Sequence, residues 1–398
     1  MNNNYRLLNY LIYVLLLFYL LVDTFTGILL RSGAGSLSVP YKIFILFLMI
    51  VVIMVSNPNK VMYLSLLACI LTFSLLSMFL RGYTNTSFVV QNFIKLISAY
   101  VFYLYFTVLV RNEPKAVVYM EKILKVNAAV FTFNMVAGML GFGYSTYSYG
   151  VGRKGFFFAG NEIFLILLSI SSIYIHKYNS RKMLLISFVS LFFAILIGTK
   201  TAMLALFIII LFNLYDKQTK NKRQLIVFFF PVLLLFFYLI FMLFLSKLDV
   251  FEHIAYNIGK NKDLTGSLLN ALMSGRITFL NNTMGLWQET HTPMSFLFGG
   301  NYFYNNKGIE IDFFDTLITN GAIITILCLA LYLYLIIKAI KRHQLVLFIL
   351  DVLVLAISFM AGHVWTNLTG GVFFVMVNIY FNIIDIKKIN NKGVLYEK

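Results

Sequence analysis

The chain has 398 residues, of which 60% are hydrophobic, 17% aromatic and only 12% charged, and its mean hydropathy is +0.85. This composition excludes a soluble globular protein, which needs more polar side chains to cover its surface. The formal net charge of +17 does not indicate a nucleic-acid partner, because much of it lies in short loops between apolar segments, where anionic lipid headgroups neutralise it.

Apolar segments recur along the whole sequence. A helix needs about 20 apolar residues to cross the roughly 30 Å hydrocarbon core of a bilayer. We therefore predict an all-α, polytopic membrane helical bundle with about 12 transmembrane helices, forming a single transmembrane domain over residues 1–398. The spans are expected at residues 7–30, 41–56, 61–80, 87–110, 116–140, 157–176, 182–198, 200–215, 224–245, 313–337, 344–361 and 369–386.

Basic residues indicate the orientation. Lysine and arginine stay in cytoplasmic loops because they translocate poorly, and the basic loops here fall on one side of the expected bundle. We therefore expect a multi-pass protein of the cytoplasmic membrane with both termini in the cytoplasm. The one long polar interval, residues 246–311 between the ninth and tenth spans, is then an extracytoplasmic loop. Within it the run 277–287 places Phe279, Thr283 and Leu286 on one face, as in an amphipathic helix at a membrane surface.

An acidic cluster ends this loop. Glu310, Asp312 and Asp315 stand where the next apolar helix begins. A charge near hydrocarbon costs several kcal/mol unless it has a partner or reaches water, so such a cluster indicates a functional site. Arg276, in the same loop, follows Ser274 and Gly275 and is suited to bidentate contact with phosphate oxygens. The alternative for Arg276 is a solvated loop side chain.

Three other cations are expected on the outer face. Arg153 and Lys154 precede glycine, three phenylalanines and Asn161, a group that could hold an anionic headgroup beside a sugar. An interfacial anchor with snorkelling cations is the alternative. Lys200 lies in the turn 198–201 between two short spans, so we expect it to be partly sunken and to find a partner such as a lipid diphosphate. Alternatively, it simply reaches up to water.

The remaining candidates lie nearer to the apolar spans. Lys95 is a cation within a span and Asp23 an acid in an outer half-span, and the two could be partners of each other. His363 lies outside, between the last two spans, as an acid, base, phosphate donor or structural residue. Cys69 and Cys328 are interpreted as packing residues. No histidine or carboxylate spacing indicates a metal, so a metal-independent site without a cofactor is expected.

The order of these features resembles the O-antigen polymerase and ligase superfamily, in particular Wzy-type polysaccharide polymerases. The matching segments are Arg153 to Glu162, Gly198-Thr199-Lys200-Thr201, Ser274-Gly275-Arg276, Phe298-Gly299-Gly300, and Glu310 to Asp315 followed by Gly321. The resemblance covers residues 150–325 by motif and implies a GT-C-like bundle that joins oligosaccharide repeat units on undecaprenyl diphosphate, with Arg153 and Arg276 contacting diphosphate or glycan. The ligase branch has a His-Asn pair at the place of Glu310 and Asp312, which favours a polymerase, and an arginine is commoner at the place of Lys200.

The chemistry of such a transfer agrees with these residues. An acceptor hydroxyl must lose a proton, for which Glu310 or Asp312 is suited. The leaving diphosphate needs preorganised cations, and the candidates are Arg153, Arg276, Lys200 and Lys95. One base and a cationic cradle predict a single displacement with inversion. The expected partners are lipid-linked glycan donor and acceptor, membrane lipids, a flippase and a chain-length regulator, and no nucleic acid. The alternatives are a flippase or transporter, a ligase and an extracytoplasmic acyltransferase.

Overall fold

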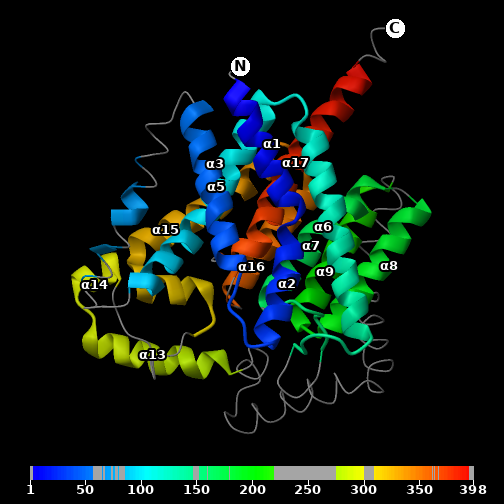
Figure 1. Ribbon diagram of the computed structural model, residues 1–398. Helices are drawn as coiled ribbons and strands as arrows, with labels where there is room; N and C mark the ends of the chain where they lie inside the picture. Colours follow the sequence, from blue (N-terminus) through cyan, green and yellow to red (C-terminus); the bar gives the residue numbers. More distant parts are fainter. Residues whose placement is uncertain are drawn as a thin grey trace.

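The structure of the protein is a computed structural model. It describes residues 3–56, 65, 68–72, 75–76, 79, 86–146, 152–158, 160–178, 180–218, 275–299, 309–360, 362, 364–365 and 367–393. Within these ranges the chain is helical and contains no β-strand, which confirms the predicted all-α class (Figure 1). One isolated β-bridge joins Ser145 to Arg153.

The helices follow the apolar segments of the sequence. They are α1 (Asn3–Leu17), α2 (Tyr19–Arg31), α3 (Ser38–Ser56), α5 (Thr86–Asn112), α6 (Ala116–Met139), α7 (Gly160–Lys177), α8 (Ser180–Ile197), α9 (Lys200–Asp216), α13 (Arg276–Thr290), α14 (Pro293–Phe298), α15 (Asp312–Lys341), α16 (Leu345–Ser358) and α17 (Leu368–Gly393). Of the expected spans, 61–80 lies largely and 224–245 wholly outside the described residues. Each of the others coincides with one helix or, at 7–30, with two.

Three of the described helices are long and apolar enough to cross a membrane alone, namely α3, α15 and the Phe93–Asn112 part of α5. The bent pair α1–α2 adds a fourth if it is one span. Several shorter apolar helices accompany them. The fold is therefore that of a helical membrane protein, and the total of about 12 spans remains a prediction.

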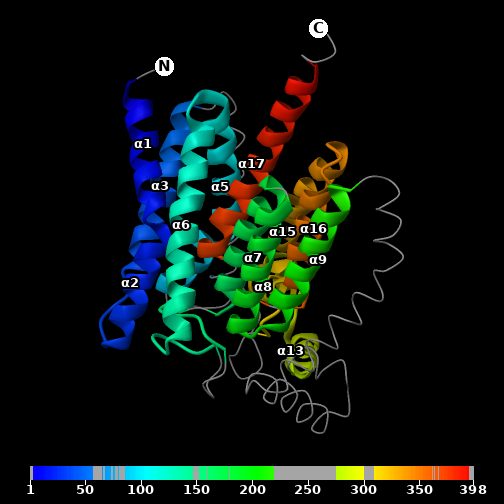
Figure 2. The ribbon, with the colours of Figure 1, turned by 90° about the vertical axis from the view of Figure 1, so that its right-hand side faces the viewer.

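The bundle has two distinct ends. Both chain termini lie at one end, here called the terminal end, and α13 lies crosswise at the other (Figures 1 and 2). We call the latter the site end, because the loop 152–158 and the turn 198–199 also lie there. Two basic residues of the expected cytoplasmic loops are bonded to neighbouring helices: Lys177 donates to Glu121 at 2.8 Å, and Arg342 donates to Asn382 at 2.5 Å. The cytoplasmic placement of these loops remains a prediction.

The first expected span is broken at Phe18, where α1 and α2 meet at 47°. A bend leaves backbone groups without their helical partners, and these groups are costly in an apolar environment. The buried Asn127 of α6 provides the replacement bonds. Its Oδ1 accepts from the Leu20 amide at 3.0 Å, and its Nδ2 donates to the Leu16 carbonyl at 2.9 Å. One side chain therefore holds the kink against the neighbouring helix.

The glycines of two predicted motifs meet beside α15. Gly299 ends α14, and Gly321 interrupts the helical backbone of α15 with φ 78°. A Cβ atom on Gly321 would lie 2.3 Å from the Leu297 carbonyl oxygen and 2.4 Å from the Gly299 amide nitrogen. Only glycine permits both this positive φ and this close approach. The pair therefore fixes α14 against the helix that carries the acidic cluster.

Candidate functional site

The first pair of predicted site residues is in contact. Arg276 begins α13, and its Nη2 lies 3.2 Å from Glu310 Oε2 (Figure 1 shows α13 at the site end). The side chains are 20% and 48% exposed. An ion pair this open contributes at most about 1 kcal/mol to stability. Two motifs 34 residues apart thus converge, as the sequence analysis expected, and the gain in stability alone does not account for the pair.

Glu310 has a strained backbone. Its φ is 63°, in the left-handed region that a residue with a side chain occupies at a cost of about 1–2 kcal/mol. Asp315 Oδ2 accepts from the Glu310 amide at 3.0 Å, and Oδ1 accepts from the Ile309 amide at 2.8 Å. The backbone of Gly362 packs so closely that a Cβ there would lie 2.9 Å from the Glu310 carbonyl carbon. The surroundings therefore hold the backbone of Glu310 in one place.

Asp312 has a different environment from Glu310. It is buried at the start of α15, and its Oδ2 accepts from the backbone amides of Val364 at 2.6 Å and Trp365 at 2.9 Å. These bonds tie the loop before α17 to the start of α15. By sequence, Asp312 and Glu310 are equivalent candidates for the base. In the structure they differ, because Asp312 binds backbone amides and Glu310 contacts Arg276.

Lys200 brings a second cation toward Arg276. It is half-buried at the start of α9, directly after the turn formed by Gly198 and Thr199, as predicted. Burial is the main influence on its charge, and the like charge of Arg276 adds a smaller unfavourable interaction. The Nε atom of Arg276 is buried and has no hydrogen-bond partner among the described residues. Two neighbouring cations with an unused donor are a favourable place for an anion.

The loop 152–158 places Arg153 beside the same turn. The Arg153 amide donates to the Leu196 carbonyl at 2.6 Å, while its side chain is exposed. Lys154 is buried instead, and its Nζ donates to the Phe158 carbonyl at 2.5 Å and lies 5.9 Å from the centre of the Tyr144 ring. Burial lowers the pKa of Lys154. Lys154 thus stabilises the loop 152–158 from within. Contact of Arg153 or Lys154 with diphosphate remains a prediction.

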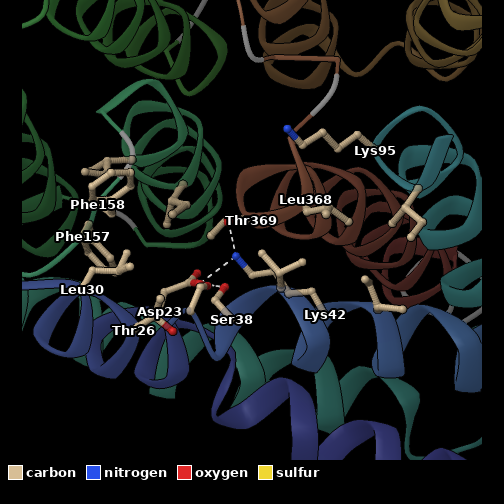
Figure 3. Close-up of a pocket in the computed structure, with 16 residues that line it drawn as sticks. Asp23, Thr26, Leu30, Ser38, Lys42, Lys95, Phe157, Phe158, Leu368 and Thr369 are labelled. Atoms are coloured by element: carbon tan, nitrogen blue, oxygen red, sulfur yellow. Dashed lines mark hydrogen bonds and ion pairs between the residues drawn. The ribbon is translucent and has the colours of Figure 1, made fainter. Parts of the chain in front are cut away.

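A cavity of about 480 Å³ opens between α2, α3, α5, α17 and the loop 152–158 (Figure 3). In its wall Asp23 pairs with Lys42 at 2.7 Å. Ser38 donates to Asp23, and Lys42 donates to Thr369 at the start of α17. Lys95 reaches the same cavity from α5 but lies apart from this pair (Figure 3).

The expected pairing of Asp23 with Lys95 is therefore replaced by one with Lys42, which the sequence analysis overlooked. The available signal was position along the chain. Asp23 and Lys42 lie within about two turns of the same short connection, residues 32–37, so an antiparallel pair of helices brings them to similar depth.

The other predicted site residues are less informative. The side chain of Asn161 and the whole of His363 lie outside the described residues. In the part of the chain that the structure describes, no group of three or more His, Cys, Asp or Glu side chains could hold a metal ion. Cys328 is buried, as expected of a packing residue, whereas Cys69 is exposed.

The fold thus defines the class as an α-helical membrane protein with polar residues from several segments collected at one end of the bundle. No family model matches the sequence, and no curated protein matches it. The resemblance to the polymerase superfamily therefore rests on the motifs named above.

Because the backbone of Glu310 is strained, replacing Glu310 with glycine is expected to remove the carboxylate without lowering the stability of the protein. Glycine adopts a positive φ without steric cost, so Glu310→Gly is expected to leave stability unchanged or raise it by up to about 1 kcal/mol. The carboxylate is lost in the same variant. Thermal unfolding of the purified variant in detergent measures the stability, with Glu289→Gly on α13 as the control, which should be destabilised. A clear loss of stability in Glu310→Gly would show that the backbone is not strained there.

Proposed function

We propose that the protein is a polysaccharide polymerase that joins oligosaccharide repeat units carried on undecaprenyl diphosphate at the outer face of the cytoplasmic membrane. The observation that supports this most strongly is the contact between Arg276 and Glu310, which come from distant segments, at the end of the bundle where α9 begins with Lys200 (Figure 2). Two cations and one carboxylate are the groups that transfer from a lipid diphosphate requires.

In the proposed reaction, Glu310 accepts the proton of a sugar hydroxyl on the acceptor unit. The hydroxyl oxygen then attacks the anomeric carbon of the donor glycan. The bond from that carbon to the diphosphate oxygen breaks, and both electrons leave with the diphosphate. Arg276 and Lys200 stabilise the negative charge that develops on the leaving group. One attack from the face opposite the leaving group inverts the anomeric configuration.

The surrounding residues position these groups. Asp315 and Gly362 hold the backbone of Glu310, and Asp312 ties the 364–365 segment to the start of α15. Arg153 stands beside the turn that carries Lys200 and is the candidate for a further contact with diphosphate or glycan. In this proposal Asp312 and Asp315 are positioning residues.

Chain growth by the purified protein tests the proposal. The protein in detergent is given lipid-linked repeat units, and products are separated by length. Wild type is expected to form a ladder, and Glu310→Gln is expected to slow its formation by about two orders of magnitude or more, since the base is lost. Glu289→Gln, an exposed carboxylate on α13, is the matched control and should match wild type.

The alternatives give different outcomes in this assay. A flippase makes no bond, so wild type would leave single repeat units in detergent, where transport has no meaning. A ligase would transfer the glycan only to an acceptor that carries no lipid diphosphate. A normal ladder from Glu310→Gln would reject the proposed site.

A further inference from the structure

The cavity lined by Asp23, Lys42 and Lys95 has a net positive charge. Asp23 and Lys42 form an ion pair at 2.7 Å, with side chains that are 12% and 7% exposed, so their charges compensate each other. Lys95 adds a third charge to the wall from α5. Its ammonium group makes no hydrogen bond or ion pair with any described residue, and the side chain is exposed and lies apart from the Asp23–Lys42 pair (Figure 3).

Hydroxyl groups share the wall with these charges. Thr26, Ser36, Ser38 and Thr369 all line the cavity. One uncompensated ammonium group together with hydroxyls is suited to a phosphate oxygen.

The rest of the wall is apolar. Leucine, isoleucine, valine and phenylalanine side chains line it, namely Leu30, Val39, Ile43, Ile94, Phe157, Phe158, Ile163, Ile166 and Leu368. A free phosphate ion gains nothing from such a surface, whereas a phosphate joined to a hydrocarbon chain buries apolar area against it. The combination therefore favours an amphiphile with an anionic head.

The cavity is connected to the proposed catalytic site through one loop. Phe157 and Phe158 line the cavity, while Arg153, in the same loop, donates from its backbone to Leu196 beside the turn that carries Lys200. The Phe156 amide donates to Asn134 Oδ1 at 3.1 Å, which fixes the loop between them to α6. Both places lie toward the site end.

We infer that this cavity is a second lipid-diphosphate site, distinct from the one at Arg276 and Lys200, and that Lys95 binds its phosphate. The inference rests on the proposed function, because a polymerase uses two lipid-linked substrates at once. The diphosphate of the donor leaves, whereas that of the acceptor stays intact. The site at Arg276 holds the former, and the cavity holds the headgroup of the acceptor carrier.

Native mass spectrometry of the detergent-solubilised protein tests this by counting bound farnesyl diphosphate. Wild type is expected to bind two molecules, Lys95→Ala one, Arg276→Ala one, and the double variant none. Titration should show that Lys95→Ala weakens the cavity site by roughly tenfold to a hundredfold, the loss of one charge-assisted hydrogen bond. Lys95→Arg keeps the charge and should keep two molecules. Lys122→Ala, an exposed lysine of α6, is the control for loss of charge.

Each outcome is decisive. Two bound molecules in Lys95→Ala would overturn the inference. Farnesol, which lacks the diphosphate, should bind no more tightly than other neutral amphiphiles. If inorganic diphosphate at equal concentration displaces farnesyl diphosphate from the cavity, the site binds free anions and the inference is overturned. Loss of one molecule in Lys95→Ala, with unchanged elution from a sizing column, supports it. If the wild-type protein forms no polymer but the Lys95→Ala variant still binds one molecule fewer than wild type, the cavity site is supported and the polymerase proposal fails.

Discussion

Replacing Arg276 with alanine is expected to lower the rate of chain growth by about two to three orders of magnitude, the usual loss when one preorganised group at a developing negative charge is removed. Its Nη2 contacts Glu310 at 3.2 Å, and its Nε has no partner among the described residues, so donors remain for an anion. The measurement is the initial rate of ladder formation from lipid-linked repeat units by purified protein in detergent.

Two further variants test whether the loss of rate is specific to the guanidinium group of Arg276. Arg276→Lys preserves the charge but not the planar fork of donors, and we expect an intermediate rate. Arg181→Ala removes an exposed arginine at the start of α8, away from the site end, and should leave the rate unchanged. A wild-type rate in Arg276→Ala would remove the central cation from the proposed mechanism, since Lys200 alone would then suffice.

The repulsion between Lys200 and Arg276 gives this expectation a thermodynamic basis. Burial is the larger influence on the charge of Lys200, and the like charge of Arg276 adds an unfavourable interaction in the unliganded protein. A diphosphate placed between them removes this repulsion and adds charge-assisted hydrogen bonds. Glu310 pairs with Arg276 in the unliganded structure. In the proposed mechanism, the substrate replaces Glu310 as the partner of Arg276, and the carboxylate is then released to act as a base.

The helices could largely be predicted from the sequence, because apolar length is a local property. The expected spans at 200–215 and 344–361 differ from α9 and α16 by only a few residues. The amphipathic run predicted at 277–287 lies within α13, which lies across the end of the bundle (Figure 1). Thr283 of this helix is buried. The break at Phe18 was not visible, because it depends on Asn127, an amide from another helix.

The candidate site could be predicted only in part. The sequence placed Arg276 and Glu310 in one polar loop, and their contact is seen only in the structure. The separate roles of Glu310 and Asp312 depend on which backbone amides each carboxylate meets. Those amides come from residues 364 and 365 for Asp312, far along the chain. Asp315 gave a weak signal, as an acid in the first turn of a helix that can bond to preceding amides. Nothing in the spacing indicated the close packing of Gly362 on Glu310.

The pairing of Asp23 with Lys42 shows the same limit. The sequence indicated Lys95 as the intramembrane cation nearest in character to a partner for Asp23, and Lys42 was not considered. Which cation meets Asp23 depends on how α2 and α3 are rotated about their axes, and apolar periodicity does not fix that rotation here, since both helices are apolar on most faces.

Lys42→Met is expected to destabilise the protein by about 3–5 kcal/mol, because it leaves Asp23 buried without its cation. Asp23→Asn should cost a similar amount by leaving Lys42 unpaired. The double variant removes both charges and should recover most of the loss, since a neutral pair of similar volume carries no uncompensated charge. Thermal unfolding of the three proteins in one detergent measures these differences. Additive losses in the double variant would show that the two residues act independently.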